Sequence, residues 1–333
     1  MGNCNCVNHI EDQTFMDAVS IPNKFEQQVV DSELVDANQG LPNVTVQALV
    51  RSYIIRKRLN RKKTREQKSP KLNQVDLRLY IPQEIQNILK DCPIFEYSVT
   101  GDIIELPENQ IFIGFLKSHD ELTPGYLISP ESYYKGSIQN MKYEGQGMLI
   151  NVNGNIYIGG FQKGVFHGKG DFQSVADNKR YSGRWEAGQC NGQGTVINAD
   201  GSVCKAIFTR GIKSGCGNIS YKDGSNYSGN FKQDQINGIG KFSWSDGRVY
   251  EGLWKDGKMH GKGKLTYPDG RIYEGEFLES IKEGSGIYIW PDGKKYEGGW
   301  KSGKQHGIGV MSENEKKLKK GEWRHGKRIR WIE

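Results

Sequence analysis

The first six residues carry groups that acylating enzymes modify. Removal of Met1 would leave Gly2 at the amino terminus, and Met-Gly in this place is typical of N-myristoylation. Cys4 and Cys6 lie beside it and are candidates for S-palmitoylation, which matters because one acyl chain alone gives only reversible membrane binding. Cys6 stands where the motif usually has Ser or Thr, so an unmodified start with two free thiols is the alternative. We expect a lipid anchor at Gly2, Cys4 and Cys6.

A basic segment follows. Residues 51–71 hold ten Lys or Arg and one acid, Glu66, whereas the first 50 residues lean acidic. Apolar residues at three- and four-residue spacing between Pro42 and Pro70 predict an amphipathic helix in residues 43–71. A basic amphipathic helix is typical of a calmodulin target or a membrane-surface helix. The residues that we expect to face an anionic membrane are Arg58, Arg61, Lys62, Lys63, Arg65 and Lys68.

The same helix resembles the IQ motif, which calmodulin and its relatives bind, often without calcium. The residues that carry the resemblance are Val46, Gln47, Val50, Arg51, Ile55 and Arg56, with Ser52 in place of the usual Gly. Two alternatives are a solvated linker helix and a helix that only binds anionic lipid. A bound calmodulin-like protein would mask the basic residues, which predicts an electrostatic switch. Nucleic acid is not an expected partner, because the positive charge is confined to one helix and no base-reading motif accompanies it.

Histidines and cysteines in the rest of the chain could in principle support catalysis. His167, His260 and His306 each precede a glycine at one repeated position, so we interpret them as parts of the fold and not as general bases. Cys190, Cys204 and Cys216 lack metal-ligand spacing. The Gly-x-Gly pairs lie at strand starts and not in a phosphate-binding strand-to-helix loop. We therefore predict no catalytic site, no metal and no cofactor.

These residues are positioned by a repeat that fills the chain from Phe112 onward. Most copies open with an aromatic residue, and the spacing between copies is 22 to 24 residues, nearly always 23. The opening positions are Phe112, Tyr134, Tyr157, Tyr181, Cys204, Tyr227, Tyr250, Tyr273, Tyr296 and Lys319. A fixed period of this length indicates a stack of identical supersecondary units, with atypical copies at the ends as caps. The copy at Cys204 lacks the aromatic residue and interrupts the series.

Each copy predicts a β-hairpin. Tyr250, Gly252 and Trp254 alternate with polar residues, as they would on one face of a strand. Gly263, Leu265 and Tyr267 form a second alternating run before the Asp-Gly turn that follows. The fold class that we predict is an all-β repeat array, a single-layer antiparallel sheet of nine or ten hairpins on the order of 90 to 100 Å long.

One face of this sheet should carry a ladder of rings. Its members are Tyr157, Phe161, Tyr181, Trp185, Tyr227, Phe231, Tyr250, Trp254, Tyr273, Phe277, Tyr296 and Trp300. Two alternatives remain open. Part of the ladder could receive a partner helix or a second copy of the chain, as in a homodimer, or the rings could close over one another and form the core.

The repeat resembles the MORN (membrane occupation and recognition nexus) family, whose units open with Tyr-x-Gly-x-Trp or Tyr-x-Gly-x-Phe and continue with His-Gly or Asn-Gly. The resemblance covers about two thirds of the chain. It implies an elongated antiparallel sheet used for scaffolding, sometimes near membranes, in junctional proteins, axonemal radial-spoke heads and extensions of plant phosphoinositide kinases. It implies no kinase here, because the repeats run to the end of this sequence.

Composition and spacing together predict four segments. Residues 1–42 are polar and expected to be disordered, 43–71 form the basic helix, 72–111 are a connector and 112–333 are the repeat array. The connector should contain a short helix at residues 83–91 and strands that cap the open edge of the sheet. Six cysteines without a pairing pattern favour a reducing compartment, and no apolar run is long enough to span a membrane.

The function that these features favour is a non-enzymatic scaffold. It would be held at the cytoplasmic face of the plasma or ciliary membrane, would dock a protein partner on the sheet and would recruit calmodulin or a related light chain. The alternatives are a structural component of cilium or cytoskeleton without the lipid anchor, and a regulatory subunit of a phosphoinositide enzyme.

Overall fold

The computed structural model describes residues 74–90, 98–115, 123–313 and 317–332. The predicted anchor segment, 1–42, and the predicted basic helix, 43–71, lie outside these residues. The described chain divides into two compact units between Gly201 and Ser202, just before Cys204. We refer to residues 74–201 as the N-terminal unit and to residues 202–332 as the C-terminal unit.

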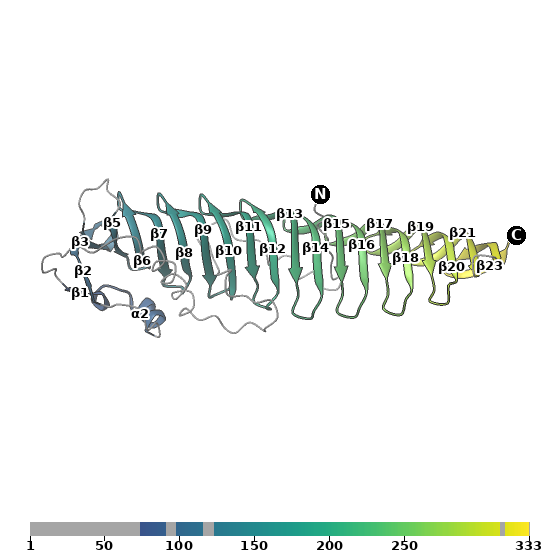
Figure 1. Ribbon diagram of the computed structural model, residues 1–333, viewed down its shortest axis with the longest axis horizontal. Coiled ribbons are helices and arrows are strands. Elements are labelled where there is room, and N and C mark those ends of the chain that lie inside the picture. The colour runs from purple at the N-terminus through teal and green to yellow at the C-terminus, as the bar shows by residue number, and fades with distance from the viewer. Residues whose placement is uncertain (1–73, 91–97, 116–122, 314–316, 333) are drawn as a thin grey trace, which may run out of the picture. The chain divides into compact units, whose positions relative to one another are not determined.

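In both units consecutive strands pair antiparallel (Figure 1). The elements of the N-terminal unit are β1 (Gln74–Asp76), η3 (Leu77–Leu79), α2 (Gln83–Leu89), β2 (Ser98–Thr100), β3 (Asp102–Leu106), η4 (Pro107–Asn109), β4 (Gln110–Gly114), β5 (Thr123–Ile128), β6 (Ser132–Gln139), β7 (Lys142–Asn151), β8 (Ile156–Gln162), β9 (Val165–Ser174), β10 (Lys179–Glu186) and β11 (Gln189–Ile197). Those of the C-terminal unit are β12 (Val203–Thr209), β13 (Ile212–Ser220), β14 (Asn226–Lys232), β15 (Gln235–Ser243), β16 (Val249–Lys255), β17 (Lys258–Thr266), β18 (Ile272–Leu278), β19 (Ile281–Ile289), β20 (Lys295–Lys301), β21 (Lys304–Glu313), β22 (Lys317–Arg324) and β23 (Lys327–Trp331). The prediction of an all-β array of antiparallel hairpins is confirmed.

Two kinds of turn alternate along the array. Asp256 and Gly257 join β16 to β17, and both have positive φ, which is the geometry of a tight hairpin turn that matches strand twist. The turn from β17 to β18 closes with a hydrogen bond from the Gly270 N–H to the Tyr267 carbonyl (3.0 Å). The carboxylate of Asp269 accepts the N–H of Arg271 in that turn (3.1 Å). The Asp-Gly turns expected from sequence are therefore present.

The hairpin pairs are not regular throughout. In β16 and β17, Gly252 pairs with Gly263 and Trp254 with Met259, so the register shifts between these pairs. Gly261 lies in the bulge with φ of 58°, a conformation that favours glycine. The repeated His-Gly dipeptide thus marks a β-bulge that bends the second strand of the hairpin.

Tyrosine rings make the core of the hairpins that open with Tyr. The ring of Tyr250 lies over Gly252 and Gly263, where an added Cβ would meet ring atoms at 2.5 to 2.7 Å. Trp254 meets this ring edge-on, with centroids 4.8 Å apart, and Phe277 of the next hairpin does the same at 5.2 Å. This hairpin is therefore packed on its successor through rings.

The connector does more than cap an edge. β3 pairs with β4 and extends the sheet to Asp102, ten residues before the predicted start at 112. α2 lies within the segment where a short helix was predicted, and it lies with β1 and β2 at the β3 end of the N-terminal unit (Figure 1). Its Ile85 and Leu89 are buried in an apolar cluster with residues of β4 to β8. We predicted that this segment would protect an edge, but it also covers a face of the sheet.

Apolar side chains on both faces of the first strands explain this. Tyr133 and Tyr134 are adjacent in β6 and therefore point to opposite faces, yet both are fully buried. Ile156, Tyr157 and Ile158 repeat the pattern in β8. A strand buried on both faces needs a second layer, which the connector supplies.

Candidate functional site

The aromatic ladder is buried. All twelve rings named from sequence are at most 8% exposed. They are Tyr157, Phe161, Tyr181, Trp185, Tyr227, Phe231, Tyr250, Trp254, Tyr273, Phe277, Tyr296 and Trp300. The structure therefore places them in the core of the hairpins, which was one of the two alternatives, and a docking surface has to be sought on other residues.

The polar atoms of these rings are also satisfied inside the fold. The hydroxyl of Tyr250 donates to the carbonyl of Leu253 (2.9 Å), and the opening tyrosine of each neighbouring hairpin makes the same bond three residues ahead. Trp254 donates its indole N–H to the Gly240 carbonyl of the preceding hairpin (3.3 Å). Burial raises the pKa of Tyr250, and it raises that of Tyr296 to about 12. These groups hold the repeat together and offer nothing to a ligand.

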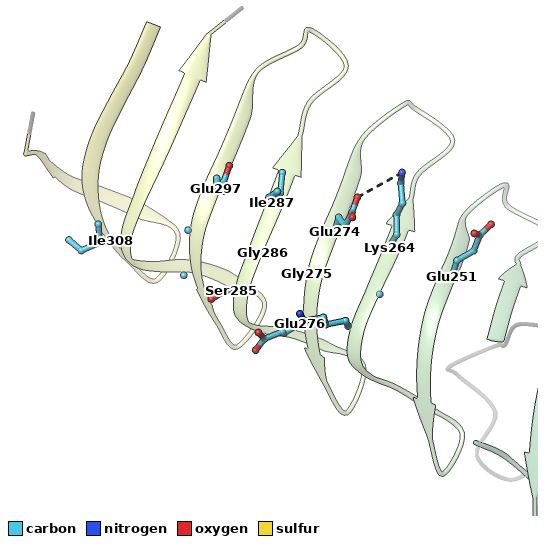
Figure 2. Close-up of a pocket in the computed structure, with 14 residues that line it drawn as sticks. Glu251, Lys264, Glu274, Gly275, Glu276, Ser285, Gly286, Ile287, Glu297 and Ile308 are labelled. Carbon is cyan, nitrogen blue, oxygen red and sulfur yellow. Dashed lines mark ion pairs between the residues drawn. The ribbon is translucent and has the colours of Figure 1, made fainter. Parts of the chain in front are cut away.

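A groove lies on the opposite face of the C-terminal unit and encloses about 880 Å³ (Figure 2). Two rows of outward side chains form its walls. Glu251, Lys264, Glu274, Ile287 and Glu297 make one row, and Lys262, Glu276, Ser285 and Ile308 make the other. We call this surface, with its floor, the glycine groove.

Glycine makes the floor. Gly263, Gly275, Gly286 and Gly298 lie between the two rows. Their missing Cβ atoms would point toward the tyrosine rings on the other face, as the close approach of Tyr273 to Gly286 shows. The same glycines that admit the rings thus leave the outer face as bare backbone, so the groove is a consequence of the core.

Acidic groups predominate along this groove. Four glutamates and two lysines line it. The ammonium of Lys264 lies 3.9 Å from Glu274, an ion pair seen in Figure 2, and Glu297 pairs with Lys295 at 2.8 Å. Glu251 pairs with Lys241 on the neighbouring strand. Because these pairs are exposed, they cost little to rearrange around a partner.

The histidines and cysteines considered from sequence lie within strands of the hairpins. His167, His260 and His306 each precede a bulge glycine, as interpreted from their spacing. Burial raises the pKa of the Cys190 and Cys204 thiols, which makes both poor nucleophiles. The residues that the structure describes contain no cluster of three or more His, Cys, Asp or Glu able to hold a metal ion.

Other predicted site residues lie outside the described chain. These are the acylation candidates Gly2, Cys4 and Cys6, the calmodulin-binding candidates Val46, Gln47, Val50, Arg51, Ile55 and Arg56, and the basic residues Arg58, Arg61, Lys62, Lys63, Arg65 and Lys68. Within the described residues, no helix is both long and apolar enough to cross a bilayer.

Comparison with protein families identifies the repeat. The family model described as "MORN repeat" matches six segments of the sequence, at residues 157–176, 181–203, 227–247, 250–270, 273–295 and 296–312. These hairpins are MORN repeats. The hairpin β6–β7, before the first matched segment, has the same core, since Tyr134 donates its hydroxyl to the Ser137 carbonyl (2.7 Å). Structural repeats therefore extend beyond the segments that the family model detects.

No curated protein matches the chain. Among solved structures, the wild-type TCP10 domain of Danio rerio CPAP matches at 10% identity over 69% of this chain and 99% of its own, with a TM-score of 0.31. The TCP domain of SAS-4 (dCPAP) from Drosophila melanogaster, in complex with a proline-rich motif of Ana2, matches at 10% identity over 58% and 86%, with a TM-score of 0.22. Likeness at this level carries no information about function, which leaves the MORN repeats as the informative match.

Proposed function

We propose that this chain is a membrane-tethered scaffold whose MORN repeats dock a protein segment in the glycine groove. MORN repeats suggest a scaffold or adaptor role. The observation that supports the choice of surface is that the rings are buried while the groove is open. Docking on this face leaves the core of the hairpins undisturbed.

The groove favours a particular kind of partner segment. The carboxylates of the groove would attract basic side chains of a partner, and Ile287 and Ile308 offer apolar contacts at opposite walls. Ile308 is 51% exposed, so a partner would remove substantial apolar surface from water. We propose an amphipathic segment with lysine or arginine on one side and leucine or isoleucine on the other.

The docking proposal is tested by charge reversal in the full-length chain. A synthetic peptide of lysine and leucine in amphipathic order serves as the probe, and its fluorescence anisotropy reports binding. Glu274→Lys with Glu276→Lys should weaken binding at least about tenfold, because two attractions become repulsions. Glu131→Lys, an exposed change in the N-terminal unit, should leave it unchanged. Equal affinity of all three proteins would place the partner elsewhere.

The tether is proposed from the sequence of the first 71 residues. Acylation of Gly2 and of Cys4 or Cys6 would supply two lipid signals, and the basic residues from Arg58 to Lys68 would add attraction to an anionic leaflet. We place the chain at the cytoplasmic face of the plasma or ciliary membrane. The alternative is a structural component of cilium or cytoskeleton, which would have the same repeats but would carry no lipid and would not bind a membrane.

Mass spectrometry of the native amino terminus separates these cases. Gly2→Ala should shift the protein from the membrane fraction to the soluble fraction, since it removes the myristoylation site. Cys4→Ser with Cys6→Ser should weaken the attachment without abolishing it. An unmodified terminus together with unchanged fractionation would exclude the lipid anchor.

Calmodulin recruitment is proposed for the IQ-like helix. Titration calorimetry of the full-length protein with calmodulin, with and without calcium, should detect binding that Gln47→Ala with Arg51→Ala abolishes. Binding should also release the basic segment from vesicles that contain anionic lipid, because the same helix carries both contacts. A ternary complex of vesicle, chain and calmodulin would show that the two contacts are independent.

A further inference from the structure

Lys282 occupies a position that the two preceding hairpins fill with apolar side chains. It is the second residue of β19 and pairs with Phe277. One and two periods earlier the chain has Met259 and Ile236, both buried. A lysine at this place brings its ammonium group into the ring layer.

Four aromatic rings surround that ammonium group. The nitrogen Nζ of Lys282 lies 4.7 Å from the ring centroid of Tyr288, 4.9 Å from Tyr273, 5.3 Å from Trp300 and 5.4 Å from Tyr267. All four distances are within the range of cation–π attraction. Among the described residues no hydrogen bond or ion pair is made by Nζ of Lys282, and its contacts within them are with ring faces.

The chain offers an internal comparison at Lys213, three periods earlier. Asp234 faces Lys213, with a carboxylate oxygen 4.0 Å from its Nζ, and accepts its backbone N–H at 2.9 Å. The residue equivalent to Asp234 beside Lys282 is Gly303. Both residues donate their N–H to the carbonyl of the lysine they face and both have positive φ. Lys213 thus has a carboxylate where Lys282 has none.

We propose that Lys282 is a site of Nζ-methylation, with the rings of Tyr267, Tyr273, Tyr288 and Trp300 as a cage for the methylated ammonium. Methylation keeps the positive charge, removes N–H groups that have no acceptor here and spreads the charge over carbon atoms that ring faces accommodate. In each transfer the neutral amine attacks the methyl group of a methylsulfonium donor. The ammonium gives one proton to water before the attack; the C–N bond then forms as the C–S bond breaks, the thioether leaves and the positive charge stays on the methylated nitrogen.

A neutral amine is accessible at this position. Burial lowers the pKa of Lys282 to about 8, and the positive charge of the Arg271 guanidinium contributes a smaller part of this shift. The carboxylate of the adjacent Glu283 is engaged by the N–H of Ser302 (2.8 Å). At neutral pH the uncharged fraction of such an amine is on the order of a hundred times that of an ordinary lysine.

Reductive methylation of the full-length protein tests the reactivity. Formaldehyde and an amine–borane at pH 7 convert lysine to dimethyl-lysine, and peptide mass spectrometry follows each site with time. Lys282 should be modified at least about tenfold faster than Lys258 and Lys295, which are also partly exposed but are ion-paired. A rate for Lys282 equal to or below theirs would overturn the proposal.

A matched variant tests whether the lack of a carboxylate beside Lys282 makes this lysine reactive. Gly303→Asp places at Lys282 the partner that Lys213 has in Asp234, at a φ that the natural aspartate also adopts. It should slow methylation of Lys282 to the rate of Lys258, because the carboxylate favours the charged amine. An unchanged rate would show that the absent carboxylate does not set the reactivity.

The cage itself is tested by stability after modification. The Tm of protein dimethylated at Lys282 should equal or exceed that of unmodified protein. The control is Lys282→Met, which has at position 282 the residue type found at the equivalent position 259. Reductive methylation of this variant modifies only the other lysines, so its change in Tm measures their effect. A Tm that falls by more than about 4 °C in the wild type but not in Lys282→Met would mean that the rings do not accept the product.

Discussion

The hydroxyl of Tyr250 donates a hydrogen bond to the backbone carbonyl of Leu253, 2.9 Å away and three residues further along the chain. The bond turns the ring of Tyr250 back across its own strand, where it lies over a pair of glycines. A phenylalanine could pack in the same place but could not satisfy the carbonyl. Tyrosine is therefore favoured for the hydrogen bond as well as for its ring.

Tyr250→Phe should lower the free energy of unfolding by about 1 kcal/mol, since a partly buried carbonyl loses its donor. Urea denaturation of the purified protein would measure this. Tyr267→Phe, at a tyrosine whose hydroxyl has no such bond to a carbonyl, should change it by less than about 0.5 kcal/mol. An equal loss in both variants would mean that the hydroxyl bond is not the cause.

Gly263→Ala should destabilise the chain by about 3 kcal/mol, because its Cβ would lie 2.5 Å from Cε2 of the Tyr250 ring. The comparison is Gly224→Ala, where φ is 91° but no atom lies within 4 Å of the added Cβ. That variant carries backbone strain without a clash and should cost about 1 kcal/mol. If Gly224→Ala cost as much as Gly263→Ala in thermal unfolding, the ring contact would not be what requires glycine.

Alkaline pH should unfold the array cooperatively. Burial raises the pKa of Tyr157, Tyr181, Tyr250 and Tyr273, and that of Tyr296 to about 12, whereas an unfolded chain has tyrosine pKa values of about 10. The stability that these groups contribute is complete below pH of about 10 and is lost as pH rises through the folded values. Tyrosinate absorbance and circular dichroism should therefore change together. Full tyrosinate absorbance at pH of about 10 with intact dichroism would contradict this.

Thiol reagents should distinguish the cysteines of the array. Cys190 and Cys204 are about 1% exposed, and burial raises the pKa of both, so their labelling requires unfolding. Cys216 is only partly buried and should react first in the native protein. Peptide mass spectrometry after short exposure to iodoacetamide would locate the label. Early labelling of Cys190 would show that the hairpin β10–β11 opens more readily than its packing indicates.

Much of the fold follows from residue types and spacing. The 23-residue period and the Asp-Gly dipeptides place strands and turns correctly, because a hairpin needs both alternation and a residue that tolerates positive φ. The glycines of the repeated His-Gly dipeptides have the positive φ of the bulge. What spacing could not show is that Tyr250 alone covers both Gly252 and Gly263, since that depends on the direction of one side chain.

Three further features were not predicted from the sequence. The second layer on the N-terminal unit was signalled by unbroken apolar runs such as Ile156 to Ile158, which indicate a strand buried on both faces. The glycine groove was not signalled, because residues such as Glu274 and Ile308 become a surface only when the strands are paired. The cage around Lys282 likewise joins rings from separate strands and turns.

The ring contact between neighbouring hairpins repeats almost unchanged. Tyr250 meets Phe277 at 5.2 Å, Tyr273 meets Trp300 at 5.0 Å and Tyr296 meets Trp323 at 5.0 Å. These three hairpins thus present the same ring contact to the hairpin after them, whereas the hairpin that opens at Cys204 lacks the tyrosine. A gene that duplicates or deletes a whole period would produce a chain whose new neighbours already fit, so length can evolve in steps of one hairpin without a new core.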